Sequence, residues 1–172
     1  RVGLFCLLIG VLAPQLSSAN AQEGPEEIPV AFSYNAVGHV AITALYDNGQ
    51  IFLPVRELFY LLLVPCERTA GQYELTGIYL DPDRRYIINF SSQIIRVGSK
   101  DFSITPGDFR ITDLDFYLTP EIFAQVFGLN FEFNLSQVSL HLESENKLPV
   151  ELQAERERAR RVDVARESRG VS

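Results

Sequence analysis

The sequence predicts an α+β fold with antiparallel sheet, built from two tandem β-β-α-β-β units and followed by a charged helical extension. The first observation is a repeat, since residues 53–64 return as residues 118–129 with their apolar positions kept. The second is the period-two alternation of apolar residues in short runs, which is typical of half-buried strands. The third is a proline near the start of each repeated helical segment, where its missing N–H costs no hydrogen bond. The matched packing positions are Leu53/Leu118, Leu58/Phe123, Leu61/Val126, Leu62/Phe127 and Val64/Leu129.

The first unit begins with two strands and a tight turn. Residues 27–34 alternate as a half-buried strand, and residues 37–46 form a second strand. Asp47-Asn48-Gly49 then predicts a hairpin, because Asn and Gly both tolerate the positive φ that the turn requires. Residues 51–53 form the returning strand, and a helix starts at Pro54 and is closed by Pro65.

The middle of the chain and the second unit continue the pattern. Strands are expected at residues 73–80, 86–90, 94–97 and 102–104, with strand-like residues before the second helix. That helix has Thr119 as its expected N-cap, Pro120 as its first residue and Gly128 as its stop. The closing strands are residues 131–133 and 138–142, and a solvated helix is expected over residues 151–169, with Glu157 placed to meet Arg161.

The predicted domain organisation has four parts. Residues 1–21 resemble an export signal, because their apolar run is shorter than the ~20 residues that span a bilayer and Ala19-Asn20-Ala21 suits a signal peptidase. A membrane anchor or a buried helix is the alternative for this segment. Residues 22–27 form a linker, residues 28–147 the duplicated domain, and residues 148–172 a charged helical linker to a further C-terminal region. The chain is therefore expected to be the N-terminal part of a longer protein.

Charge and cysteine content narrow the function classes. The formal net charge is −7, and the acidic excess lies in residues 22–150. An acidic body without a basic stripe argues against a nucleic-acid partner, because neutralising phosphates dominates such binding. After removal of the export signal only Cys66 remains, so no internal disulfide can form. Its expected state is a buried or half-buried apolar thiol.

Few residues suggest chemistry. The two histidines, His39 and His141, are far apart in the sequence and are expected to be separate surface residues rather than metal ligands, since a zinc or copper centre usually needs three or four convergent ligands. Asp81 and Asp83 flank a proline, and turn formation explains them. No nucleophile elbow, phosphate-binding glycine loop or zinc-protease motif occurs, so no enzyme activity is expected.

Asp113 and Asp115 are the one carboxylate pair that leaves two interpretations open. They are two residues apart in an expected extended run, which would place both side chains on one side of a strand. Such a pair could bind a cation or supply acid and base groups. The alternative, a solvent-facing pair beside inward Leu114 and Phe116, is favoured.

The stretch from Asp47 to Leu58 resembles the copper amine oxidase N-terminal-like domain, also called the stalk domain. The family pattern is a strand, an Asn-Gly turn, and Leu/Val-Pro-Leu-Arg opening a helix that ends near a glycine. Here residues 53–56 fit, while Leu63 occupies the place of that glycine; the second copy keeps Gly128 and loses the arginine. The resemblance covers residues 36–143 and implies an accessory module of exported bacterial proteins. No position matches a copper or quinone centre, so neither copper nor oxidase activity is implied.

The expected function is that of a non-catalytic, exported bacterial cell-envelope module without metal or cofactor. Its expected partner is an envelope protein or a cell-wall polymer, and it would touch a membrane only through a C-terminal domain beyond Ser172. Its expected location is periplasmic, outer-membrane-associated or on the cell surface. The alternative is the targeting module of a cell-wall hydrolase or another enzyme. A small-ligand or cation-binding domain that uses Asp113 and Asp115 is the third possibility.

Overall fold

The computed structural model describes residues 24–70 and 73–167. It has a mixed α+β fold with two sheets and, in the described residues, three helices. The expected export signal, residues 1–21, lies outside the described residues, as do the first two positions of the expected linker. Among the described helices, none combines the length and the apolar character needed to cross a bilayer.

The larger sheet has seven strands in the order β11-β12-β1-β2-β3-β10-β9. Strand β1 pairs with β2 in antiparallel fashion along its whole length, and its other edge pairs with β12 in parallel. The sheet is therefore mixed, which corrects the expectation of purely antiparallel pairing. Its strands are β1 (Glu26–Tyr34), β2 (Gly38–Asp47), β3 (Gln50–Pro54), β9 (Phe109–Ile111), β10 (Phe116–Leu118), β11 (Leu129–Asn134) and β12 (Ser139–Ser144).

The smaller sheet is an antiparallel meander of five strands in chain order. Two short strands, β4 here and β9 in the larger sheet, are additions to the predicted set, because they are too short to show an alternating pattern. The last strand of the meander begins earlier than predicted, at Lys100 instead of Phe102. The strands are β4 (Glu67–Arg68), β5 (Glu74–Ile78), β6 (Arg85–Asn89), β7 (Ile94–Val97) and β8 (Lys100–Ser103).

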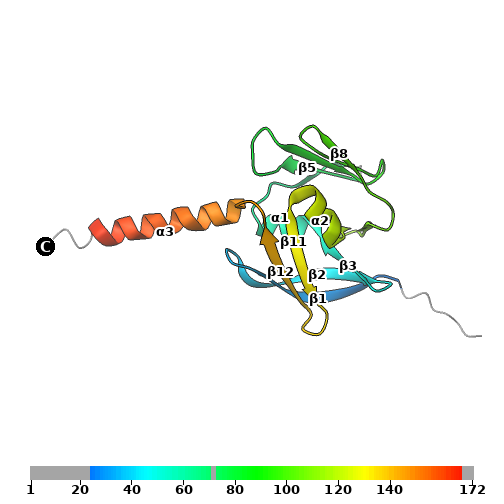
Figure 1. Ribbon diagram of the computed structural model, residues 1–172, viewed down its shortest axis with the longest axis horizontal. Helices are drawn as coiled ribbons and strands as arrows, with labels where there is room; N and C mark the ends of the chain where they lie inside the picture. The colour runs from blue at the N-terminus through cyan, green and yellow to red at the C-terminus, as the bar shows by residue number, and fades with distance from the viewer. Residues whose placement is uncertain (1–23, 71–72, 168–172) are drawn as a thin grey trace, which may run out of the picture.

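Helices α1 (Val55–Leu61) and α2 (Pro120–Phe127) lie between the two sheets (Figure 1). Both sheets and both helices contribute to one continuous apolar core. Phe59 of α1 contacts Tyr86 of β6 edge-on at a centroid distance of 5.5 Å, and Phe127 of α2 contacts Phe59 at 5.3 Å. Each such pair adds about 0.5–1.5 kcal/mol beyond the area it buries. The aromatic cluster therefore joins the smaller sheet to both helices.

The predicted Asn-Gly turn between β2 and β3 is confirmed, with φ of 50° at Asn48 and 83° at Gly49. Next to it, Arg110 of β9 donates from Nε and Nη2 to the Asp47 carboxylate at 2.8 and 2.6 Å. The guanidinium also lies over the Phe52 ring at 4.2 Å. This half-buried contact fixes β9 against the β2–β3 turn, since a planar guanidinium can bind a carboxylate and stack on an aromatic ring at once.

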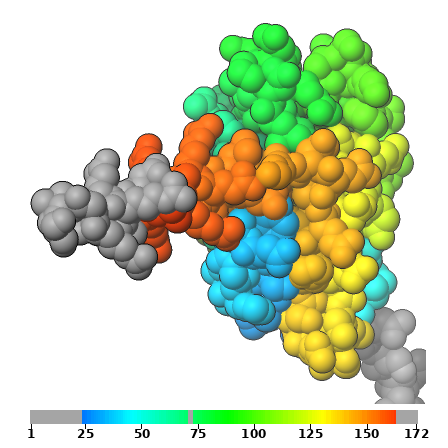
Figure 2. Space-filling model, turned by 60° about the vertical axis from the view of Figure 1, so that its left-hand side comes forward, coloured from blue at the N-terminus to red at the C-terminus, as the bar shows by residue number. Residues whose placement is uncertain are grey.

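Helix α3 (Pro149–Glu167) extends away from the body of the two sheets (Figures 1 and 2). Its first turn is held by the buried Leu148, whose N–H donates to the Glu151 carboxylate at 2.9 Å. The predicted helix is thus confirmed up to Glu167, and its last two predicted positions lie outside the described residues. The predicted contact of Glu157 with Arg161 is wrong for the described side chains. Gln153 Nε2 donates to Glu157 instead, at 3.1 Å.

Candidate functional site

Helix α1 buries one face and exposes another. Val55, Leu58 and Phe59 are fully buried, whereas Tyr60 is 79% exposed, the largest value among the exposed apolar side chains of the described residues. Leu63, just after the helix, is 41% exposed. Because burying an aromatic or aliphatic side chain yields about 1.5–3 kcal/mol, two large apolar residues left in water beside each other mark a surface that a partner can cover.

The helix end that presents these residues is built in an unusual way. Leu63 has a φ of 57°, a left-handed conformation that normally belongs to glycine. Its N–H donates to Tyr60 O at 3.2 Å, and the Val64 N–H donates to Phe59 O at 2.8 Å. This is the double hydrogen bond of a Schellman ending. The second helix ends in the same left-handed conformation at Gly128, with a φ of 65°, as predicted.

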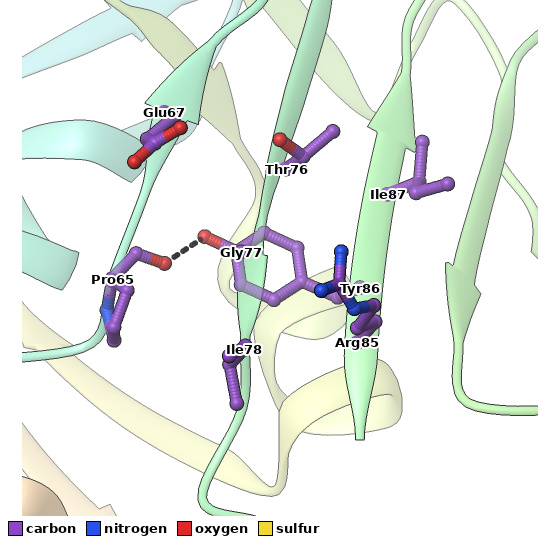
Figure 3. Close-up of a pocket in the computed structure, with 8 residues that line it drawn as sticks. All are labelled: Pro65, Glu67, Thr76, Gly77, Ile78, Arg85, Tyr86 and Ile87. Carbon is purple, nitrogen blue, oxygen red and sulfur yellow. Dashed lines mark hydrogen bonds between the residues drawn. The ribbon is translucent and has the colours of Figure 1, made fainter. Parts of the chain in front are cut away.

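Two adjoining hollows share Pro65 on this side of the molecule. One, of about 290 Å³, is lined by Tyr60, Leu63 and Cys66 among others. The other, of about 380 Å³, extends over the smaller sheet, where Thr76 and Ile87 lie on its neighbouring strands (Figure 3). The smaller hollow lies beside α1 and is lined mainly by apolar residues, whereas Glu67, Thr76 and Arg85 also line the larger one.

The second hollow depends on a close approach of three chain segments. The Tyr86 hydroxyl donates to Pro65 O at 2.7 Å, and its ring lies across Gly77 (Figure 3). A Cβ at Gly77 would lie 2.7 Å from the Tyr86 ring and would also collide with Pro65 O. Only glycine fits here, so the wall of the hollow is specified by Gly77.

Leu114 adds a further exposed apolar side chain next to Arg56 in the first turn of α1. It is 70% exposed, and its carbonyl accepts a hydrogen bond from Arg56 Nη1 at 3.3 Å. The prediction that Leu114 points inward is therefore wrong, because residues 112–115 form a bend and not a strand. We call the group formed by Arg56, Tyr60, Leu63, Pro65 and Leu114 the Tyr60 surface.

The same bend separates the two aspartates that the sequence places side by side. Asp113 is exposed, whereas Asp115 is buried and binds the first turn of α1. The Asp115 carboxylate accepts from the backbone N–H groups of Arg56 and Glu57 at 3.2 and 3.1 Å. Burial raises the pKa of Asp115, and these backbone donors oppose part of that rise. Asp115, which directly precedes β10, thus caps α1. The prediction that Asp113 and Asp115 share one face of a strand is wrong, and so is the favoured solvent-facing placement of Asp115.

The structure brings the two histidines closer than their sequence separation suggests. In the strand register Ser33 of β1 lies opposite His39 of β2 on one side and opposite His141 of β12 on the other. Ser33 Oγ and His141 Nδ1 are 3.0 Å apart. The parallel pairing of β1 with β12 causes this arrangement, and no local sequence pattern indicates that pairing. Both imidazoles are exposed on the outer face of the larger sheet.

Neither the histidines nor Cys66 belongs to a metal centre in the part of the chain that the structure describes. No three His, Cys, Asp or Glu side chains converge there in a geometry that could hold an ion. Cys66 is half-buried, as predicted, and burial raises the pKa of its thiol. A raised pKa keeps the thiol protonated and weakly nucleophilic.

Asp81 acts in a turn, as predicted, since its carboxylate accepts from the Asp83 N–H at 3.0 Å. The exposed apolar side chains at α1 therefore make the Tyr60 surface the candidate site of the described residues. Comparison with known proteins found no matching family model, no similar curated protein and no similar solved structure.

Proposed function

We propose that the chain is a non-catalytic module of the bacterial cell envelope, exported by residues 1–21, and that it binds an envelope protein or a cell-wall polymer through the Tyr60 surface. The observation that carries the proposal is the exposure of Tyr60 and Leu114, at 79% and 70%, beside the guanidinium of Arg56. Tyr and Arg are among the residue types most enriched at the centres of protein interfaces. We also propose that the chain is related to the stalk-domain family.

We include in the proposal the duplicated architecture of two β-β-α-β-β units. Three observations support it. Leu53 and Leu118, which the repeat matches, lie opposite each other in the antiparallel β3–β10 pair. Each of these strands leads directly into a helix, and both helices end in a left-handed residue, Leu63 or Gly128. A duplicated core whose copies share packing residues and no polar cluster fits a binding role better than catalysis.

The test measures retention of the full chain on purified cell wall and on immobilised envelope proteins. The variants Tyr60→Ser and Leu114→Ser should each lower retention at least about tenfold, because each removes an apolar anchor worth about 1.5–3 kcal/mol. Tyr73→Ser is the matched control, since Tyr73 is 53% exposed, directly precedes β5 of the smaller sheet and lies outside the Tyr60 surface. Equal retention of all three variants would exclude the Tyr60 surface as the binding site.

The alternative is that the module targets a cell-wall hydrolase or another enzyme located further along the chain. It uses the same surface and differs in the kind of protein to which the module belongs. The sequence of the gene that encodes the module separates the two, because a metal-binding or nucleophile motif in the same gene supports the alternative.

A further inference from the structure

Each of the two sheets has two edges, and three of these four edges are protected against pairing with another strand. Strand β4 is two residues long and both are charged, while β8 is four residues long and carries the charged Lys100 and Asp101. At the β9 edge, the Arg110 guanidinium binds the carbonyls of Pro106 and Phe109 at 2.9 and 2.7 Å. Short length and charge are the usual means by which proteins prevent edge-to-edge pairing.

The fourth edge, β11, lacks these protections. It is six residues long, and Glu132 is its one charged residue. Phe131 and Phe133 are half-buried and pack against the core, with the Phe131 ring 5.3 Å from that of Phe123. The strand is therefore held in its extended form by its own side chains.

The hydrogen-bond pattern shows which backbone groups of β11 face outward. Glu145 N–H donates to Gly128 O at 3.2 Å, and this pair continues the β11–β12 register. In an antiparallel ladder every second pair is hydrogen-bonded, so Asn130, Glu132 and Asn134 direct their backbone groups to β12. On the far side of β12, Ala31 N–H donates to Val138 O at 3.0 Å, which fits the same alternation.

Three residues of β11 consequently turn their N–H and C=O groups toward the open edge: Leu129, Phe131 and Phe133. Within residues 24–70 and 73–167 these outward-facing N–H and C=O groups have no hydrogen-bond partner. Exposed backbone donors and acceptors in one line, above a fixed apolar face, are the template for addition of a strand.

Charge indicates what kind of strand fits. The outer face beside the edge carries Glu132 and, opposite Asn130, Glu143. A second copy of the chain gains no charge pairing. In the register that bonds the open residues to each other, with Phe131 opposite Phe131, Glu132 lies opposite Asn130 and diagonally across from the Glu132 of the second copy, and like charges across a strand pair are unfavourable. A strand with lysine or arginine on its outer face would form favourable pairs instead.

We propose that the β11 edge binds an extended segment of a partner protein that has alternating apolar residues on one face and basic residues on the other. The segment adds antiparallel to β11, its backbone bonding Leu129, Phe131 and Phe133. This surface is separate from the Tyr60 surface, so the inference goes beyond the proposed function.

The test titrates the full chain with a nine-residue peptide with capped ends. Every second residue of the peptide is Val, which forms its apolar face, and the residues between are alternately Lys and Thr, which form its outer face. Binding is followed by amide NMR shifts and by hydrogen exchange. Saturable binding should slow exchange of the Phe131 and Phe133 amides. The Glu132→Lys variant should bind this peptide about tenfold more weakly, since an attractive cross-strand pair becomes repulsive. Glu26→Lys, an equal charge change at the exposed start of β1, should leave the affinity unchanged.

Four outcomes would overturn the inference: no saturable binding, shifts confined to other edges, equal weakening by Glu132→Lys and Glu26→Lys, or pairing of two copies through β11 that the peptide does not displace. Tyr60→Ser should leave peptide binding intact. If Tyr60→Ser loses partner retention and the peptide does not bind, only the β11 inference is excluded. If Tyr60→Ser keeps partner retention and the peptide binds, only the proposed function is excluded.

Discussion

Leu63 pays a conformational cost that its counterpart Gly128 avoids. Its φ of 57° brings Cβ close to the following carbonyl, which costs about 1–2 kcal/mol for a residue other than glycine. Glycine at this position would relieve that strain, but its greater freedom in the unfolded chain would offset about 0.5–1 kcal/mol of the relief. The Leu63→Gly variant should therefore raise the free energy of unfolding by about 0.5–1 kcal/mol, measured by urea denaturation.

The control for this prediction is Leu63→Ala, which removes the side chain but keeps Cβ and hence the strain. It should give no stabilisation. An increase in stability for both variants alike would show that the exposed leucine side chain, and not the backbone conformation, is unfavourable.

Asp115 should make stability depend on pH in a direction opposite to that of most carboxylates. Burial raises its pKa in the folded chain above the ordinary value of about 3.9. The folded state then binds the proton more tightly than the unfolded state. The stabilisation that this tighter binding gives the folded chain is full below the ordinary pKa and is lost as pH rises through the raised pKa of the folded state. The stability of the wild type relative to Asp115→Asn should thus be greater near pH 4 than near pH 7.

Urea denaturation of both proteins at the two pH values gives this difference directly. A relative stability that increases with pH would show that the N–H groups of Arg56 and Glu57 outweigh burial. Asp115→Ala should cost about 1–2 kcal/mol at neutral pH, because the first turn of α1 loses its acceptor.

At this scale the sequence predicts some roles and misassigns others. Leu63 can be identified in advance, because the repeat aligns it with Gly128. Asp115 cannot, since the period-two rule assumes an extended chain and residues 112–115 bend. That bend sends Asp115 inward and Leu114 outward, so the exposed residue that completes the Tyr60 surface is one that the pattern predicts to be buried.

At the scale of elements, the contact between β5, β6 and the segment after α1 depends on Gly77. The Gly77→Ala variant should lower the free energy of unfolding by about 3 kcal/mol, because the new Cβ meets the Tyr86 ring and Pro65 O with no flexible group to yield. Thermal unfolding monitored by circular dichroism measures the loss.

A matched variant, Tyr86→Phe, keeps the ring and removes only the hydroxyl, which leaves Pro65 O without its donor. It should cost about 1–3 kcal/mol. If Gly77→Ala is as stable as the wild type, the three segments do not approach as closely as described.

Local patterns predict the long elements, whereas they do not predict how these elements pair. Residues 27–34 alternate clearly, and both helices are marked by a proline and apolar spacing, so these elements are predicted near their observed bounds. The parallel pairing of β1 with β12 joins residues about a hundred positions apart. No local propensity encodes such a contact, and this is why the sequence does not predict the proximity of His39 and His141 to Ser33.

For the whole molecule, two sheets share one core through α1 and α2, so the exposed face of α1 stands on a rigid support. Its apolar residues are close in the sequence, except for Leu114, which the bend before β10 brings next to Arg56 in the first turn of the helix. The molecule thus presents two separate surfaces, the Tyr60 surface on α1 and the open edge of β11. The sequence predicts a binding role but neither location, because both depend on which side chains and edges the packing leaves uncovered.

The most direct test of the central claim is site-specific photo-crosslinking in living cells, with a photoreactive phenylalanine analogue in place of Tyr60 or Tyr73. Both residues are exposed tyrosines, so the comparison isolates their location on the molecule. The Tyr60 surface predicts a discrete crosslinked adduct at position 60 and none at position 73. Equal adducts at the two positions, or an adduct at position 73 alone, would contradict it.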